Sequence, residues 1–364
     1  MKHAIRSAAL AICIVAAAAA LGGPAAAERQ APSASRVEQS FASRIEQLSE
    51  PEGDFDTDNL ISNEQAYLDV IPALKAAGTS GGAYIGVGPD QNFSYIAAIR
   101  PAIAFIIDLR RDNLLLHLLF KGLFAQARNR AEYLSLLTGR AAPDRVETWR
   151  DASLERIVAY IDRTKPVDEL VRALHGRVDA AIGRSGVPLS AGDRKTIERF
   201  HAVFIEAGLS LKFETRGRGP RDYYPTYREL LLTRDPNGRQ SNYLASERDF
   251  EFVQSLEARD LIVPVVGDLS GPHAMAAIGA MMAERGERLS AFYVSNVENY
   301  LFRDGHFPRF AGNLRRLPRD PRGVIIRSIF GGASSTSAVQ SANEMVSSFS
   351  SGRYRSYRDL VGSR

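Results

Sequence analysis

Residues 83–113, AYIGVGPDQNFSYIAAIRPAIAFIIDLRRDN, contain the pattern that decides the fold. A short apolar strand ends in the turn 86–89, a segment of helical length follows, and a second apolar strand ends at Asp108. Glycines let the backbone turn tightly and approach a ligand, and the free N–H groups of the next helix point to the same place. This order of strand, glycine turn, helix, strand and acid predicts the first unit of a nucleotide-binding α/β domain.

The spacing within this unit favours a nucleoside ligand. Asp108 lies 20 positions after Gly88, and an acid at about this separation usually reaches the ribose hydroxyls. The three-glycine fingerprint is incomplete, because Asn92 and Phe93 stand where a third glycine is expected. A glycine turn between a strand and a helix also occurs in α/β proteins that bind no ligand there.

Three aspartates have an alternative role as helix caps. Asp90, Asp108 and Asp268 each stand just before a predicted helix, where an aspartate commonly accepts a hydrogen bond from a free backbone N–H group. The sequence leaves both roles open. The candidate cofactor-binding residues are Gly86, Gly88, Asp90, Asp108 and Asp268.

The composition is that of a globular protein with a small positive charge. The chain has 364 residues, of which 45% are hydrophobic and 24% are charged, close to the averages for soluble proteins. The formal net charge of +4 is too small to predict a nucleic-acid partner, and there is no long run of Lys or Arg. We therefore expect a small-molecule ligand, and the sequence identifies no protein partner.

The first 27 residues have the order of a secretory signal peptide. Lys2 and Arg6 precede an apolar run over residues 8–21, and small residues lead to Ala27. The apolar run is shorter than the ~20 residues that span a bilayer. We expect cleavage after Ala27, export to the periplasm or the medium, and no stable membrane span after cleavage.

Cysteine and histidine usage argues against several kinds of site. The single cysteine, Cys13, lies within the predicted signal peptide, so the mature chain is expected to have no disulfide, thiolate metal site or cysteine nucleophile. The six histidines show no metal-ligand spacing, and no metal site is expected. His117 stands in an apolar helix and is expected to be a buried core residue.

The rest of the chain divides by pattern. Apolar residues at helical spacing predict a helix over 57–78. Further strands are predicted over 260–268, 291–295 and 324–329, with helices between them. The predicted parts are a polar linker (28–54), the first half of an α/β domain (55–128), a mostly helical insertion (129–255), the second half of the domain (256–332) and a polar C-terminal tail with a helix (333–364).

These elements predict one fold class. Strands separated by helices favour a mostly parallel sheet with helices on both faces, and right-handed crossovers favour a doubly wound, Rossmann-like topology. Neither half has enough strands to bury both faces of a sheet, so we expect the halves to join across the insertion. Ligands in such sheets bind beyond the carboxyl ends of the strands, where the strand order reverses.

The strand ends together resemble those of class I S-adenosylmethionine-dependent methyltransferases. In that superfamily a glycine turn follows the first strand, and acids after the second and third strands contact the ribose and the adenine. Gly86 and Gly88 match the glycine turn, Asp108 the first acid, and Asp268 the second. The resemblance implies S-adenosylmethionine as the cofactor.

Polar and aromatic residues after the fourth strand of that superfamily approach the transferred methyl group. Residues 296–300, Asn-Val-Glu-Asn-Tyr, correspond to them. A carboxylate there can act as a general base, and an amide can hold a substrate amine; the alternative is that these are ordinary loop and cap residues. The candidate catalytic residues are Asn296, Glu298 and Tyr300.

The resemblance covers residues 57–113 and 260–330, with departures. The acid usual in the first strand is absent, since Ala83 and Tyr84 stand there, and the Asn-Pro-Pro-Tyr motif of amino-methylating enzymes is absent too. No sixth or seventh strand is evident. The segment YVSNVENYLF also resembles an uncharacterised family of exported bacterial proteins.

Two functions are therefore predicted. The strand ends favour a methyltransferase-like protein that binds S-adenosylmethionine. The signal peptide favours an exported, non-catalytic binding or interaction protein that keeps the fold without the activity. The two conflict, because S-adenosylmethionine is made in the cytosol and a chain exported unfolded carries no bound cofactor.

Overall fold

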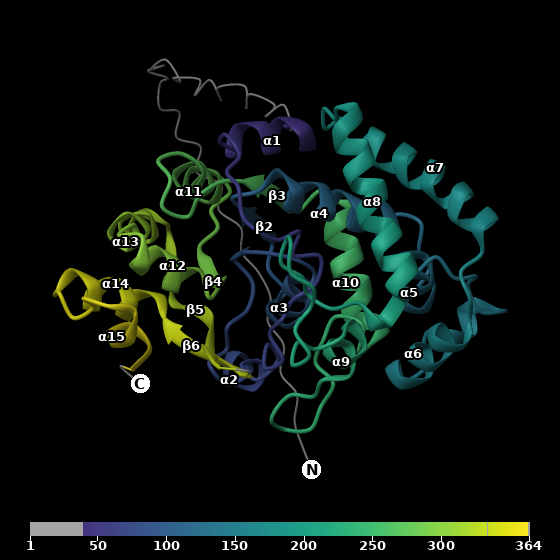
Figure 1. Ribbon diagram of the computed structural model, residues 1–364. Helices are drawn as coiled ribbons and strands as arrows, with labels where there is room; N and C mark the ends of the chain where they lie inside the picture. The colour runs from purple at the N-terminus through teal and green to yellow at the C-terminus, as the bar shows by residue number, and fades with distance from the viewer. Residues whose placement is uncertain (1–38, 333, 363–364) are drawn as a thin grey trace, which may run out of the picture. The chain divides into compact units, whose positions relative to one another are not determined.

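The computed structural model describes residues 39–332 and 334–362 (Figure 1). The predicted signal peptide and residues 28–38 of the predicted linker lie outside the described residues. The described residues group into one unit by their contacts.

The fold is α/β, as predicted, and is built on a six-stranded, mostly parallel sheet with the strand order β3-β2-β1-β4-β5-β6. The first five strands in this order are parallel to their neighbours, and β6 is antiparallel to β5. The strands are β1 (Ala83–Gly86), β2 (Ile103–Asp108), β3 (Ile262–Val266), β4 (Leu289–Ser295), β5 (Arg319–Gly331) and β6 (Ser334–Ser341).

Continuous apolar runs explain the central strands. All four residues of β1 and all five of β3 are buried, as is β2 up to its last residue, Asp108. Such runs suit parallel strands that are covered on both faces. Proline has no backbone N–H group to donate to a neighbouring strand. Pro264 is tolerated in β3 because, within the described sheet, β3 is an edge strand that pairs only with β2.

The strand order changes direction beside β1. The chain runs outward from β1 to β2 and β3, and then returns to pair β4 with the other side of β1. Two segments that are more than 150 residues apart in sequence, 83–108 and 262–295, thereby form one sheet. The carboxyl ends of β1 and β4 consequently stand next to each other.

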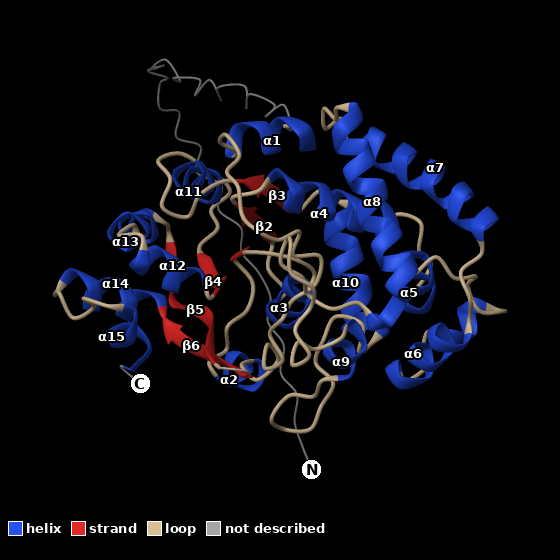
Figure 2. Cartoon of the chain, viewed as in Figure 1, coloured by secondary structure: helices blue, strands red, loops and turns tan. Residues whose placement is uncertain are grey.

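Helices cover both faces of the sheet (Figure 2). In this view α11 to α14 lie on one side of the strands, and α4 and α10 lie on the other. Helix α1 contacts β3 and α11. The helices outside the segment 129–255 are α1 (Phe41–Leu48), α2 (Ile71–Ala76), α3 (Gln91–Ile99), α4 (Arg111–Phe124), α11 (Ala274–Glu284), α12 (Val297–Arg303), α13 (Phe307–Arg316), α14 (Ala342–Ser350) and α15 (Tyr357–Gly362).

The segment between β2 and β3 adds a helical layer. Helix α4 contacts β2 and β3 and also α7 and α8, which explains why apolar residues surround it on nearly all sides. The elements of the segment are α5 (Arg130–Leu137), η1 (Val146–Trp149), α6 (Leu154–Arg163), α7 (Asp168–Arg184), α8 (Ala191–Ala207), η2 (Gly208–Ser210), α9 (Tyr227–Leu232) and α10 (Glu247–Ala258).

The helix predicted over 57–78 is mostly wrong, since only α2 forms there. Side chains before α2 bond the backbone locally: the Thr57 hydroxyl accepts from the Asn59 N–H group at 3.0 Å, and the Ser62 hydroxyl accepts from the Glu64 N–H group at 3.1 Å. Such bonds compete with a helix. Residues 54–64 are therefore free to cross the carboxyl ends of the strands.

The predicted polar tail contains a strand that the sequence did not reveal. Strand β6 pairs with β5 from Ser341 opposite Val324 to Ser334 opposite Gly331. Its sequence, SSTSAVQS, is polar and Ser-rich, and its residues are half-buried or exposed because it forms an edge of the sheet. Backbone pairing to β5, rather than an apolar pattern, holds this strand in place.

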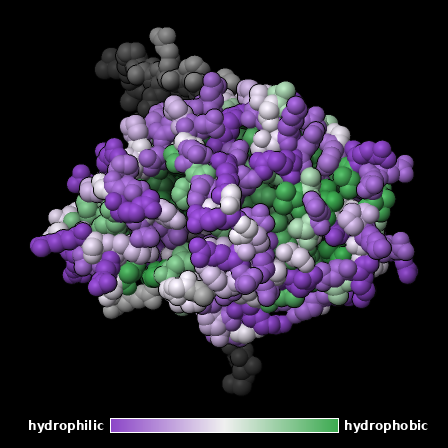
Figure 3. Space-filling view, viewed as in Figure 1, coloured by the Kyte–Doolittle hydropathy of each residue, from purple (hydrophilic) through white to green (hydrophobic). Residues whose placement is uncertain are grey.

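The surface offers few large apolar side chains. Most of the face in Figure 3 is hydrophilic, and among the described residues the exposed large hydrophobic ones are Phe55, Val167, Leu170 and Tyr223. None of the helices in residues 39–332 and 334–362 has both the length and the apolar composition needed to cross a membrane.

Candidate functional site

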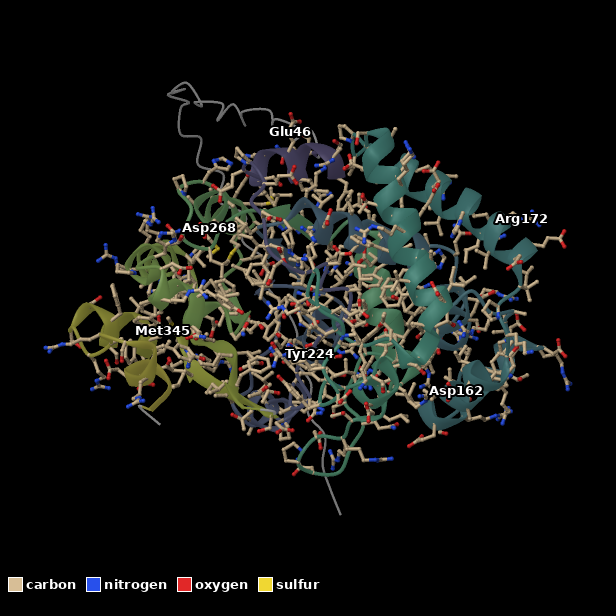
Figure 4. All side chains as sticks on the ribbon, viewed as in Figure 1. Glu46, Asp162, Arg172, Tyr224, Asp268 and Met345 are labelled. Atoms are coloured by element: carbon tan, nitrogen blue, oxygen red, sulfur yellow. The ribbon has the colours of Figure 1, made fainter. Side chains whose placement is uncertain are left out.

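A cavity of about 570 Å³ lies at the carboxyl ends of the strands. This volume is in the range of small-molecule sites. Loops after β1, β2, β3 and β4 form its walls together with residues 54–64 and the loop 213–224; Figure 4 labels Asp268 and Tyr224 from two of these segments. Lining residues include Thr57, Asn59, Glu64, Gly88, Gln91, Asp108, Arg110, Arg218, Tyr224, Asp268, Ser295, Asn296, Tyr300, Arg303 and His306.

The two glycines of the first turn have different roles. Gly88 lines the cavity with a φ of +81°, a conformation that favours glycine. Gly86 does not line it: a Cβ there would stand 1.9 Å from the Asn92 side-chain oxygen, so close packing inside the turn requires this glycine. The prediction that Gly86 approaches a cofactor is corrected to a packing role.

Asn92, at the place of the missing third glycine, holds the turn together. Its amide group donates to the carbonyl oxygens of Val87 at 2.9 Å and Pro89 at 2.7 Å, and its oxygen accepts from the Tyr84 hydroxyl at 2.7 Å. Asn92 is fully buried. The Asn92 side chain therefore fixes this turn, which is built from a Gly-rich loop in other nucleotide-binding domains.

His117 supports the same turn from α4. Its Nε2 atom lies 2.9 Å from the carbonyl oxygen of Gly88, and burial lowers the pKa of this histidine to about 4. The ring is therefore neutral near pH 7. His117 is a buried core residue, as predicted.

Asp108 lines the cavity at the end of β2, with Arg110 bound to it. The Arg110 guanidinium donates to one carboxylate oxygen at 3.0 Å and to the other at 2.8 Å, and the Arg110 N–H group also donates to the carboxylate at 3.0 Å. The guanidinium donates further to the Thr57 carbonyl at 2.6 Å. Helix α4 has Arg110 at its N-cap and no side-chain cap, so Asp108 does not cap it.

Asp90 lies away from the cavity. It stands at the N-cap of α3 without a side-chain capping bond, and its carboxylate accepts hydrogen bonds from the hydroxyls of Tyr227 at 2.7 Å and Tyr243 at 3.2 Å. Burial raises the pKa of Asp90 to about 6. The prediction of cofactor binding is corrected: Asp90 belongs to a buried cluster with two tyrosines of the helical segment.

Asp268 lines the cavity at the end of β3. Its carboxylate accepts from the N–H group of Ser270 at 2.7 Å and from the Ser270 hydroxyl at 3.0 Å. Helix α11 begins later, with His273 at its N-cap. Asp268 therefore forms a local turn rather than a helix cap.

The residues after β4 divide between the cavity and the core. Asn296 and Tyr300 line the cavity, and the Tyr300 ring packs edge-on against Phe55 with ring centroids 5.5 Å apart. Glu298 is 1% exposed and is bound by the Arg327 guanidinium at 2.6 and 3.1 Å. Glu298 is therefore not available as a general base, and the prediction for it is corrected.

The structure reveals an acid that the sequence analysis missed. Glu64 lines the cavity from the segment before α2 and is only 2% exposed. Its carboxylate accepts from the Tyr293 hydroxyl at 2.6 Å and from the hydroxyls of Ser295 and Ser328. Burial raises the pKa of Glu64, and the three hydroxyls act in the opposite direction. No sequence pattern connects Glu64 with partners on β4 and β5.

Two neighbours of Glu64 also face the cavity. Ser295 lines it and has a φ of +52°, an uncommon conformation for a residue other than glycine. Gln91 lines it as well, and its amide group donates to the Tyr293 hydroxyl at 3.1 Å. The Gln91 side-chain oxygen is buried and has no hydrogen-bond partner within the described part of the chain.

An ionic network lies next to the wall of the cavity that Asp54 lines. Arg216, in the loop 213–224, forms ion pairs with Asp54 at 3.1 Å, Asp58 at 3.4 Å and Asp112 at 3.2 Å. Each pair is partly exposed to solvent, so each contributes little alone. Together they attach the loop of the helical segment to the segment 54–64.

The donor set of the cavity does not suggest a metal. No group of three or more His, Cys, Asp or Glu side chains that could hold a metal ion occurs among the residues with described positions. The polar groups of the cavity are carboxylates, guanidinium groups, hydroxyls, amides and the imidazole of His306.

The chain matches a family model. A family model described as a domain of unknown function, DUF7790, matches residues 60–158 and 213–354. No curated protein matches the chain. The matched residues include Glu64, Asp108, Asp268 and the loop after β4, and they make up most of the chain. The chain belongs to the DUF7790 family.

Proposed function

We propose that the cavity binds S-adenosylmethionine or a related adenosine-type ligand, and that the protein is methyltransferase-like. The observation that carries this proposal is the meeting of residues from three separate strand ends, Gly88, Asp108 and Asp268, on one cavity. These are the residues that the resemblance to class I methyltransferases assigns to the cofactor.

The sheet supports the same proposal. Its parallel order, β3-β2-β1-β4-β5, reverses between β1 and β4 and has an antiparallel strand at one edge. This order resembles the doubly wound, Rossmann-like sheet of class I methyltransferases, in which ligands bind where the strand order reverses. The described sheet departs from that arrangement in having no parallel strand beyond the antiparallel one.

The lining suits a ligand that carries both signs of charge. The cavity presents carboxylates, among them Asp108 and Asp268, together with the guanidinium groups of Arg218, Arg221 and Arg303. S-adenosylmethionine has a carboxylate, an ammonium group and a sulfonium centre, and when bound it supplies an activated methyl group. Gly88 permits close approach of its backbone, and Asp108 presents its carboxylate for the ribose.

The fit is incomplete at Asp108. Arg110 occupies one edge of this carboxylate, with two bonds on one oxygen and one on the other. Each carboxylate oxygen accepts about two hydrogen bonds, so the second oxygen keeps room for a ribose hydroxyl. Asn296 and Tyr300 are the residues of the predicted catalytic group that reach the cavity, where they would position an acceptor substrate.

A second candidate is a non-catalytic binding protein that is exported. The arginine pairs of Asp108 and Glu298 favour it, because both acids are already engaged. The predicted signal peptide agrees with it. A mature N-terminus at Glu28 in mass spectrometry of the secreted protein would support export, and an intact Met1 on cytosolic protein would support the enzyme.

Calorimetry with S-adenosylhomocysteine and S-adenosylmethionine tests the main proposal. We expect binding by the wild type, and a loss of about 10-fold to 150-fold in Asp108→Asn, since a hydrogen bond to a charged group contributes about 1.5–3 kcal/mol. Asp162→Asn is the matched control, because Asp162 forms an exposed pair with Arg228 outside the cavity. A wild type with no measurable affinity for either nucleoside removes the methyltransferase proposal.

A further inference from the structure

The carboxylate of Glu64 is buried in the cavity wall without a counter-charge. Three hydroxyl groups donate to it, from Tyr293, Ser295 and Ser328. Hydroxyls satisfy the lone pairs of a carboxylate but leave its charge uncompensated, which is costly in a buried place. No Lys, Arg or His of residues 39–332 and 334–362 forms an ion pair with Glu64, and the nearby Arg327 is engaged by Glu298.

A second acceptor faces the same place. The buried side-chain oxygen of Gln91 lacks a partner, and the amide group of Gln91 donates to the hydroxyl of Tyr293 that in turn donates to Glu64. One hydroxyl thus joins the two acceptor groups. Both residues line the cavity. A carboxylate without a counter-charge beside an amide oxygen without a donor fits a ligand group that has several N–H bonds and a positive charge.

The backbone at Ser295 holds this arrangement. Its positive φ places the Ser295 side chain beside Glu64 at the point where β4 ends. Strained residues of this kind persist where the surroundings determine them, and they concentrate at functional sites. Ser295 is therefore a positioning residue for the carboxylate.

We propose that Glu64 and Gln91 bind the protonated amino group of a ligand, and that the substrate of this protein is an amine. This inference deepens the proposed function. A role of the amine as methyl acceptor rests on that proposed function. The apolar part of the ligand has a wall in Phe55 and Tyr300, whose rings pack edge-on at 5.5 Å beside the same cavity. An aryl-alkyl amine matches both parts of the site.

Tyramine and 4-ethylphenol test the proposal, because they share the ring and the two-carbon chain and differ in the amino group. In calorimetry at up to about 10 mM ligand, we expect the wild type to bind tyramine at least about 10-fold more tightly than 4-ethylphenol. Glu64→Gln keeps the shape and removes the charge, and it is expected to abolish this preference. Equal affinity for the two compounds in the wild type, or no binding of either, overturns the proposal.

Asp304→Asn is the control for unspecific charge attraction. Asp304 also lines the cavity, but its carboxylate is exposed and pairs with Arg303. We expect this variant to keep the preference for tyramine. If it loses the preference as fully as Glu64→Gln does, the amine is not bound at Glu64.

A measurement on the wild type alone covers the case in which Glu64→Gln does not fold. Because the pKa of Glu64 is raised, the preference for tyramine should weaken on acidification at pH values above the ordinary glutamate pKa of about 4.3, while the amine stays protonated. The titratable groups that face Glu64 are Tyr84 of β1, Tyr95 of α3 and Tyr293 of β4, and burial raises the pKa of each well above its usual value. A preference that does not weaken toward acid contradicts a role of the carboxylate.

The two proposals fail separately. Loss of nucleoside binding in the wild type with a retained preference for tyramine removes the methyltransferase proposal and leaves an amine-binding protein. Nucleoside binding without a preference for tyramine removes the amine inference and leaves the proposed function.

Discussion

The Tyr227 hydroxyl donates a hydrogen bond of 2.7 Å to the Asp90 carboxylate, and this bond joins the helical segment to the turn after β1. Tyr227 begins α9, and Asp90 directly precedes α3. Both side chains are buried. The helical segment therefore contributes to the cavity in two ways, through the loop that lines it and through this contact behind the first turn.

Removal of the Tyr227 hydroxyl tests the contact. At pH values above the pKa of about 6 for Asp90, Tyr227→Phe removes a hydrogen bond to a buried carboxylate. We expect the free energy of unfolding to fall by about 1.5–3 kcal/mol. At about pH 5 the carboxyl is mostly protonated, and the loss should be nearer 1 kcal/mol. Urea unfolding at both pH values measures the difference. Tyr160→Phe is the control, since Tyr160 donates to a neutral carbonyl at 3.0 Å and its loss should not change with pH.

The buried acid Glu257 predicts a fall in stability toward alkaline pH. Burial raises its pKa to about 7 although Lys121 lies 3.5 Å away. Because the pKa of Glu257 is higher in the folded than in the unfolded protein, its contribution to the free energy of unfolding is complete below about pH 4.5. This contribution is lost as the pH rises through about 7. Over this interval the free energy of unfolding of the wild type should fall by up to about 3 kcal/mol relative to that of Glu257→Gln. The exposed Glu251→Gln should follow the wild type in the same urea titrations; a pH profile of Glu257→Gln that matches the wild type would contradict the prediction.

The pair of Glu298 and Arg327 is expected to stabilise the fold rather than to take part in chemistry. Glu298→Gln leaves a buried guanidinium without its partner charge, which costs about 3–5 kcal/mol. The double variant Glu298→Leu/Arg327→Met should recover most of this loss, because paired apolar residues of similar volume replace buried ion pairs well. Chemical denaturation of the three proteins gives the comparison. If the double variant is no more stable than the single one, the pair does not act as a unit.

Arg216 is expected to hold the loop that covers the cavity. Arg216→Gln breaks three partly exposed ion pairs, and since each contributes about 0–1 kcal/mol, we expect little change in global stability. Amide hydrogen exchange should instead become faster in residues 213–219 and stay unchanged in α8. Arg228→Gln, which breaks an exposed pair with Asp162, serves as the control and should leave the loop as it is. Unchanged exchange in the loop of Arg216→Gln would mean that other contacts hold it.

The α/β class and the parallel sheet followed from local patterns. Continuous apolar runs, each ending in a turn or an acid, predicted β1 to β5 because burial on both faces leaves that signature. The residues after β1 to β4 were predictable as cavity residues, since parallel strands place their carboxyl ends at one edge of the sheet. Strand β6 was missed because a polar edge strand has no such signature.

The wrong predictions at the site concern side chains that point into the core instead of into the cavity. Glu298 is buried in α12 and does not line the cavity, whereas Asn296, Tyr300 and Leu301 line it. A local sequence pattern places this stretch at the cavity but does not give the direction of each side chain. Glu64 could not be found in this way, because its partners stand 229 to 264 residues later in the chain.

This separation between Glu64 and its partners has a consequence for how the protein matures. During synthesis Glu64 leaves the ribosome long before Tyr293 and Ser328, so its set of hydroxyl partners is complete only when nearly the whole chain has emerged. A fragment that ends before β5 lacks the hydroxyl group of Ser328. If Glu64 binds a ligand as proposed, the complete site requires a chain that extends through β5.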